Sequence, residues 1–157
     1  MLKNIIKKSD LTNTIRTLRR KGNRIVFTNG VFDILHRGHV EYLSKAKNSG
    51  DILIVGLNSD ASVRRLKGVN RPLNNQNDRA VILLGLKAVD YVVIFGEDTP
   101  DKLIKQIRPD ILVKGADYKL NEIVGADFVK SYGGKIKRIK LTLGRSSSKI
   151  LKKLSKF

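Results

Sequence analysis

The sequence predicts an α/β domain built on a doubly wound, mostly parallel five-stranded sheet with helices on both of its faces. Short apolar runs alternate with segments of helical spacing along the chain, which is the pattern of consecutive βαβ units. Two of these runs, residues 52–57 and 91–95, are unbroken, as is typical of strands buried on both faces. The 157 residues correspond to one ordinary domain.

The N-terminal segment, residues 1–21, is expected to contain a helix that begins near Asp10 as its N-cap. Leu11, Ile15 and Leu18 then fall on one helical face. We expect this segment to precede a core of about residues 22–145, with a C-terminal helical segment at residues 146–157.

The first half of the core is predicted to hold two strands and two helices. A β-rich run at residues 24–28 stops at the turn signal Asn29-Gly30, and residues 38–48 have helical apolar spacing. The buried strand 52–57 follows, and Asn58-Ser59-Asp60 supplies an N-cap for a short helix toward Lys67.

The second half continues the alternation. A helix is expected at residues 78–89, before the strand 91–95, and Pro100 suits the first turn of the next helix. An apolar strand at 111–113 follows. The residues of the helix 78–89 that we expect to face inward are Val81, Ile82, Leu84, Leu86 and Ala88.

Three further elements complete the predicted order. Residues 122–132 form a helix that ends before Gly133-Gly134. Residues 136–143 alternate basic and apolar side chains, which indicates a more exposed or edge strand. Residues 146–154 form the last helix.

Composition excludes several classes of protein. Without cysteine, the chain can form neither a disulfide framework nor a thiolate zinc site. No apolar run approaches the roughly 18–20 residues that span a bilayer, and the N-terminus lacks the apolar stretch of a secretory signal. We therefore expect a cytoplasmic protein with no membrane partner.

The net charge of +18 is concentrated at the two ends of the chain. Residues 1–24 carry eight basic and one acidic side chain, and residues 130–157 carry ten basic and no acidic ones. Such ends could bind nucleic-acid phosphates non-specifically, but four Tyr and five Phe are few for a base-stacking surface. A solvated, lysine-rich surface is the other interpretation, and we expect no specific nucleic-acid partner.

The loop from Thr28 to His39 is the strongest candidate for chemistry. It follows a predicted strand and leads into a helix, where free N–H groups and a partial positive charge attract anions. His36 and His39, the only histidines of the chain, are three residues apart and can donate to phosphate oxygens from one helical face. Gly30 and Gly38 allow the backbone to approach a ligand closely.

Three more strand-end segments carry groups suited to phosphate. The first runs from Asp60 to Arg79 and contains five basic residues, although a solvated basic helix face has the same composition. The second is Lys114-Gly115-Ala116-Asp117-Tyr118, directly after a buried strand. The third is Gly144-Arg145-Ser146-Ser147-Ser148, where serine hydroxyls precede a helix. The G-x-x-x-x-G-K-[ST] motif of P-loop nucleotide hydrolases is absent.

The loop containing His36-Arg37-Gly38-His39 closely resembles the H-x-G-H signature of the cytidylyltransferase-like nucleotidyltransferases. Residues 58–68, 71–74, Glu97-Asp98-Thr99-Pro100 and 114–118 are similar to one branch, the D-glycero-β-D-manno-heptose 1-phosphate adenylyltransferases, also called ADP-heptose synthases. The similarity runs from about residue 10 to residue 155.

Two departures stand out from that branch. Ala116 replaces the second glycine of K-G-G-D-Y, and Ser147-Ser148 replace two threonines while keeping their hydroxyls. We find no place for the charge of Arg145. The branch domain is often fused behind a sugar kinase, which this sequence does not contain.

The resemblance implies a Rossmann-like fold and the reaction of ATP with heptose 1-phosphate to give ADP-heptose and pyrophosphate. Mg²⁺ is expected to accompany ATP, held by the phosphates with at most Asp33 as a protein ligand. No catalytic triad or carboxylate pair is visible, and a phosphate nucleophile requires none. The alternatives left open are a glycerol-3-phosphate-type cytidylyltransferase and a nucleic-acid-binding or regulatory protein on a degenerate nucleotidyltransferase fold. Homo-oligomerisation also stays open.

Our hypothesis for the site divides its residues into three sets. The catalytic set is His36, His39 and Lys67. The nucleotide-binding set is Thr28, Asn29, Gly30, Phe32, Asp33, Gly38, Lys45, Arg79, Gly115, Asp117, Ser146, Ser147 and Ser148. The substrate-binding set is Asp60, Lys67, Lys114 and Tyr118.

Overall fold

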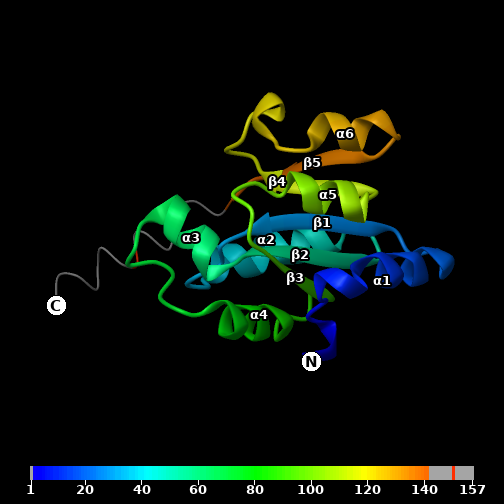
Figure 1. Cartoon of the computed structure of the whole chain (residues 1–157). Coiled ribbons are helices and arrows are strands. Elements are labelled where there is room, and N and C mark those ends of the chain that lie inside the picture. Colours follow the sequence, from blue (N-terminus) through cyan, green and yellow to red (C-terminus); the bar gives the residue numbers. More distant parts are fainter. Residues whose placement is uncertain (1, 142–149, 151–157) are drawn as a thin grey trace.

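A computed structural model describes residues 2–141 and 150 and places five parallel strands in one sheet of order β3-β2-β1-β4-β5. Figure 1 shows the sheet with β3 and β5 at its two edges. The strands are β1 (Ile25–Gly30), β2 (Ile52–Asn58), β3 (Tyr91–Phe95), β4 (Ile111–Gly115) and β5 (Lys135–Ile139).

Six α-helices and two short 3₁₀ helices connect the strands or precede them in the described part of the chain. The α-helices are α1 (Lys8–Arg20), α2 (Arg37–Lys47), α3 (Asp60–Lys67), α4 (Gln76–Leu84), α5 (Asp101–Ile107) and α6 (Ala126–Ser131). The 3₁₀ helices are η1 (Leu2–Asn4) and η2 (Leu120–Glu122).

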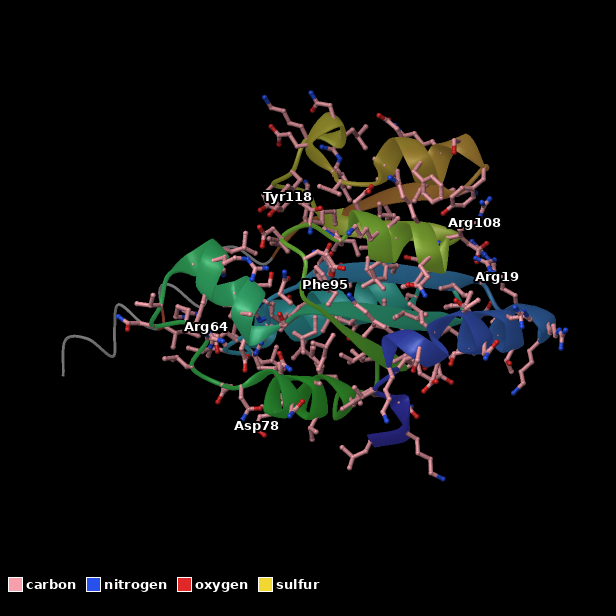
Figure 2. All side chains as sticks on the ribbon, in the orientation of Figure 1. Arg19, Arg64, Asp78, Phe95, Arg108 and Tyr118 are labelled. Atoms are coloured by element: carbon pink, nitrogen blue, oxygen red, sulfur yellow. The ribbon has the colours of Figure 1, made fainter. Side chains whose placement is uncertain are left out.

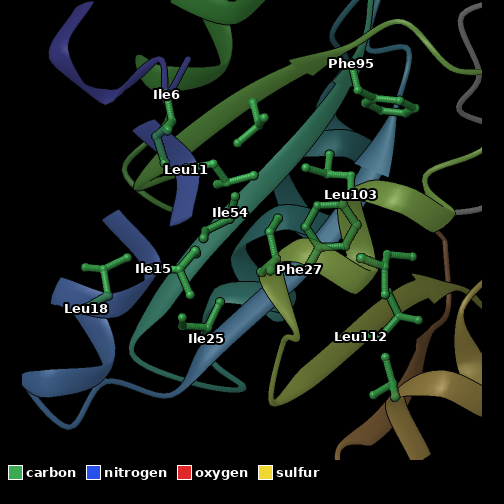
Figure 3. Packing of buried hydrophobic residues seen from close by; sticks show 14 of the residues in the cluster. Ile6, Leu11, Ile15, Leu18, Ile25, Phe27, Ile54, Phe95, Leu103 and Leu112 are labelled. Atoms are coloured by element: carbon green, nitrogen blue, oxygen red, sulfur yellow. The ribbon is translucent and has the colours of Figure 1, made fainter. Parts of the chain in front are cut away.

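Each strand divides its side chains between two hydrophobic cores on opposite faces of the sheet, because successive strand residues point to opposite sides. On β1, Phe27 belongs to the core beneath α1, α5 and α6, whereas Val26 belongs to the core beneath α2 and α4. Figure 3 shows Leu11 of α1 and Leu103 of α5 in the first core, together with Ile54 of β2. The predicted doubly wound parallel sheet with helices on both faces is therefore confirmed.

The strand order reverses at the centre of the sheet. The chain passes from β1 outward to β2 and β3, then returns to the other side of β1 to form β4 and β5. The crevice between the carboxyl ends of β1 and β4 is therefore a topological switch point, where doubly wound sheets bind their ligands.

The two edge strands of the sheet, β5 and β3, differ in how far they are covered. β5 is an edge strand with mostly exposed or half-buried residues, as the alternating pattern predicted, although it ends at Ile139 rather than at residue 143. The opposite edge strand, β3, is covered by the N-terminal segment, in which Ile5 bridges Val92 and the Ile6 N–H donates to the Val92 carbonyl at 2.8 Å. This contact protects the apolar edge.

Several predicted helix details were wrong. α4 begins at Gln76, because the Asn75 side chain caps it by accepting from the N–H groups of residues 77 and 78. The buried residues of α4 are Arg79, Ala80 and Leu83, and Ile82 is 45% exposed; of the residues expected to face inward, Leu84, Leu86 and Ala88 are half-buried and pack against the core. α6 begins only at Ala126, because the preceding residues form η2 and a turn. The helix predicted at residues 146–154 lies, apart from residue 150, outside the described residues.

Candidate active site

A cavity of about 570 Å³ opens at the carboxyl ends of the strands, above the switch point. Its wall comes from the loop after β1, the end of α3 and the loop that follows it, the loop before α5, and the loop after β4. Figure 2 shows Tyr118 at this end of the molecule and Arg19 and Arg108 at the other. Segments far apart in the sequence thus meet at one site.

The histidine pair lies at the junction of the β1 loop and α2. His36 is the N-cap residue of α2, and its ring stacks on that of His39 with centroids 3.9 Å apart and planes 23° from parallel. The ring of Phe32 meets His39 edge-on at 5.3 Å, so the second imidazole is fixed between two rings. Phe32 itself takes a left-handed conformation at φ 47°, which turns the loop sharply toward the helix.

His39 is electrically neutral near pH 7. Burial, followed by the neighbouring His36 and Lys67, lowers the pKa of His39 to about 4. Its Nδ1 is buried and has no hydrogen-bond partner. An N–H at that position would be left unpaired, which costs more than an unpaired lone pair, so the proton of the neutral ring belongs on Nε2.

Lys67, the last residue of α3, adds a cation to the same end of the cavity. Burial, and then the positive charge of Arg71, lower the pKa of Lys67, while Asp33 opposes them. Arg71 also lines the cavity and pairs with the Asp33 carboxylate at 2.7 Å. This end of the cavity therefore presents two cations and two imidazoles to a ligand.

Asp33 fastens the β1 loop to the loop between α3 and α4. Its carboxylate accepts from Arg71 Nε at 2.7 Å and from the backbone N–H groups of Leu73 and Asn74 at 2.9 and 3.0 Å. Burial alone would raise the pKa of Asp33, but these donors together hold it below its usual value. With its side chain 1% exposed, this carboxylate is occupied by the protein itself.

Arg79 makes a second connection between the same loops. Its Nη1 donates to the Val31 carbonyl at 2.6 Å, its Nε to the Asn74 carbonyl at 3.0 Å, and its Nη2 to Asp60 Oδ1 at 2.7 Å. The Arg79 side chain is 0% exposed and that of Asp60 is 24% exposed. Both side chains therefore support the cavity wall from behind.

The other half of the cavity is built around the end of β4. Lys114 Nζ donates to Asn29 Oδ1 at 2.9 Å and lies 5.1 Å from the centre of the Tyr118 ring. A β-carbon on Gly115 would meet Asp117 Oδ1 at 2.3 Å, so the Asp117 carboxylate lies directly against the strand end. Leu141 and Val124 contribute apolar surface to this half.

The structure brings most of the expected site residues into one cavity wall. They are Asn29, Gly30, Phe32, Asp33, His36, Gly38, His39, Lys67, Lys114, Gly115, Asp117 and Tyr118. Ser146, Ser147 and Ser148 lie outside the described residues, so their expected contacts stay predictions.

Four expected site residues lie outside the cavity wall. Asp60 and Arg79 are paired with each other behind it, and Lys45 is exposed on α2. Thr28 is buried, and its hydroxyl lies 2.7 Å from the Tyr42 hydroxyl, because its place on β1 directs it to the α2 face.

Tyr42 and Arg71 line the cavity but were not among the expected site residues. The spacing of α2 places Tyr42 one turn beyond His39, a signal that sequence inspection could have used. Arg71 was expected only as part of a basic segment and of the branch-like segment 71–74, because its pairing with Asp33 joins residues 38 positions apart.

Two classes of feature are absent from the part of the chain that the structure describes. No three or more His, Cys, Asp or Glu side chains gather there as a metal cluster. None of the helices within residues 2–141 and 150 has the length and apolarity needed to cross a membrane.

Comparison with known proteins agrees with this geometry. Residues 27–153 match the family model described as cytidylyltransferase-like. The chain is 57% identical over 150 residues to the bifunctional protein HldE of Wolinella succinogenes, covering 96% of this chain and 31% of that protein. It is 60% identical over 136 residues to the bifunctional protein HldE of Campylobacter curvus, covering 87% and 28%. The chain thus spans less than a third of these relatives.

Two solved structures resemble the fold. A lipopolysaccharide core biosynthesis protein from Thermoplasma volcanium matches with a TM-score of 0.63 and 33% identity, covering 77% of this chain and 98% of that one. A pantoate–β-alanine ligase from Francisella tularensis matches with a TM-score of 0.56 and 19% identity, covering 92% and 69%, and supports the fold alone. The chain belongs to the cytidylyltransferase-like family and is a nucleotidyltransferase.

Proposed function

We propose that the chain is an adenylyltransferase that joins AMP from ATP to D-glycero-β-D-manno-heptose 1-phosphate, with release of pyrophosphate. The observation that carries this proposal is the cluster of His36, His39, Lys67 and Arg71 at one end of a cavity over the switch point. The similarity to HldE proteins and to a lipopolysaccharide core biosynthesis protein favours a sugar phosphate as the acceptor.

The proposed reaction needs no protein base. A phosphate monoester is already an anion, so its oxygen attacks the α-phosphorus of ATP directly. The new P–O bond forms in line with the bond between the α-phosphorus and the oxygen that bridges it to the β-phosphate. That bond breaks, and the β- and γ-phosphates leave together as pyrophosphate. The task of the protein is therefore to align two polyanions and to stabilise the charge that develops between them.

The histidine pair and Lys67 are suited to that task. With its proton on Nε2, a neutral His39 would offer an N–H donor to a phosphate oxygen, and Lys67 would add a cation. Removing one such donor typically lowers the rate by about 100- to 1000-fold. The ring of His39 is held between those of His36 and Phe32, whereas Lys67 is an exposed residue at the end of α3.

Mg²⁺ is expected to enter with ATP, where it would neutralise charge on the triphosphate. Among the described residues, Asp33 is poorly suited to be a ligand of Mg²⁺, because its carboxylate already accepts hydrogen bonds from Arg71 and from two backbone N–H groups. The metal would therefore be held by phosphate oxygens and water, as Mg²⁺ commonly is.

A pyrophosphate-release assay tests the proposal. ATP and CTP would each be offered with heptose 1-phosphate and with glycerol 3-phosphate. We expect turnover with ATP and heptose 1-phosphate and at least about tenfold less in the other three combinations. Preferred turnover of CTP with glycerol 3-phosphate would identify a cytidylyltransferase, and no pyrophosphate release in any combination would contradict the proposal.

A further inference from the structure

We propose that Lys114 binds the α-phosphate of the nucleotide and that its charge is kept in the cavity for that purpose at the expense of stability in the ligand-free protein. The inference rests on the proposed binding of a nucleotide in this cavity. It assigns to Lys114 a role apart from the acceptor sugar, with which sequence reasoning had grouped it.

Within residues 2–141 and 150, the Lys114 ammonium forms no ion pair. Burial lowers the pKa of Lys114, and Asp117 opposes this only in part. Among residues 2–141 and 150, no carboxylate oxygen lies within 4.0 Å of its Nζ; its contacts are the neutral Asn29 amide and the Tyr118 ring. Lys114 is half-buried, and a charge withdrawn from water in this way is normally paired, so leaving it unpaired costs stability.

The polar neighbours of Lys114 hold its ammonium without pairing it with a carboxylate. Asn29 is the penultimate residue of β1, and its amide oxygen accepts from Lys114 Nζ at 2.9 Å, which occupies one of the three N–H donors of the ammonium. Asp117 could have supplied the missing negative charge, but its carboxylate lies against Gly115 instead. The remaining donors of Lys114 are therefore available to a ligand in the cavity.

Lys114 contacts residues from two unlike parts of the cavity wall. Through Asn29 it is joined to β1, whose following loop carries the histidines that suit the outer phosphates and the leaving pyrophosphate. It also faces the ring of Tyr118, which together with the apolar Leu141 offers surface that suits a nucleoside. The phosphate that joins these two parts of a nucleotide is the α-phosphate, and its charge would supply the missing partner.

This assignment predicts opposite effects on stability and on binding. Lys114→Met removes a half-buried, unpaired charge while preserving the length of the side chain. We expect the Tm of the ligand-free protein to rise by at least about 2 °C. We expect the Kd for ATP and for AMP to increase about 10- to 100-fold, because a hydrogen bond to a charged group is lost. The Kd for adenosine should stay unchanged.

Two further variants complete the experiment. Lys87→Met removes an exposed lysine outside the cavity wall and should alter neither the Tm of the free protein nor the Kd for AMP. Lys114→Arg keeps the charge and should retain more AMP affinity than Lys114→Met. All variants would be measured as the full chain by thermal unfolding and calorimetric titration.

A structural role for Lys114 would give a different result. If Lys114→Met lowers the Tm, or leaves the Kd for AMP unchanged, the proposal is overturned. If the wild-type protein binds CTP rather than ATP, and Lys114→Met weakens CMP but not cytidine, the phosphate role is supported while the adenylyl specificity fails. If the wild-type protein binds no nucleotide, both proposals fail.

Discussion

Replacing Arg79 by methionine should lower the Tm of the protein markedly, because the buried Arg79 guanidinium links two loops through three hydrogen bonds. The substitution leaves the Asp60 carboxylate without its partner and removes the donors to the Val31 and Asn74 carbonyls. Breaking a buried ion pair in this way typically costs about 3–5 kcal/mol. For a domain of this size, that loss corresponds to a decrease in Tm of roughly 6–20 °C.

The comparison variant is Lys105→Met, which removes an exposed lysine paired with Asp101 on α5. Surface pairs of this kind contribute at most about 1 kcal/mol, so its Tm should change little. Thermal unfolding followed by circular dichroism, with urea titration as a second probe, would measure both variants.

The opposite result has a clear meaning. If Arg79→Met unfolds within about 2 °C of the wild type but loses turnover, Arg79 acts on a substrate rather than on the cavity wall. That outcome would refute our reading of its buried contacts and would restore the phosphate-binding role predicted from the sequence.

Three further predictions concern the cavity. His39→Asn should reduce kcat by about 100- to 1000-fold in a pyrophosphate-release assay with its circular dichroism spectrum unchanged, whereas a loss below tenfold would contradict the donor role. Because the pKa of His39 falls from 6.5 to about 4 on folding, the unfolded chain binds the extra proton between these values. Stability should therefore decrease as the pH falls from 6.5 to 4, and His39→Asn should flatten this decrease in urea titrations; an unaltered slope would argue against it. Asp33→Asn should release Arg71 and raise the KM for ATP, with a lower Tm; an unchanged KM would separate Arg71 from the substrate.

The strands of the sheet could be predicted because the apolar pattern that specifies each one lies within a few consecutive residues. The unbroken apolar runs at β2 and β3 exceed what a half-exposed strand would carry, and each is followed by a helix signal. The face of α4 could not be predicted in the same way. Four consecutive apolar residues, 81–84, leave the inward face undetermined, and the residue that settles it is a buried arginine. No scale of hydrophobicity places Arg79 inside the protein.

The site residues likewise differ in whether local sequence patterns could place them. His36 and His39 could be assigned because one short loop and one helix start contain both of them. Thr28 is on the same face of β1 as Val26, so the alternation along the strand already directed it toward α2, where it contacts Tyr42; Tyr42 lines the cavity and Thr28 does not. The pairs Arg71–Asp33 and Arg79–Asp60 depend on how the loops fold together, which local patterns do not encode.

The two links between the loop after β1 and the loop between α3 and α4 should couple the binding of the two proposed substrates. Asp33 and Arg79 join the segment that leads to His39 to the segment that carries Arg71, so we expect the two segments to move together. A ligand that orders one segment should then also order the contacts offered to its co-substrate. Such coupling is reciprocal, so each substrate should raise the affinity for the other by the same factor.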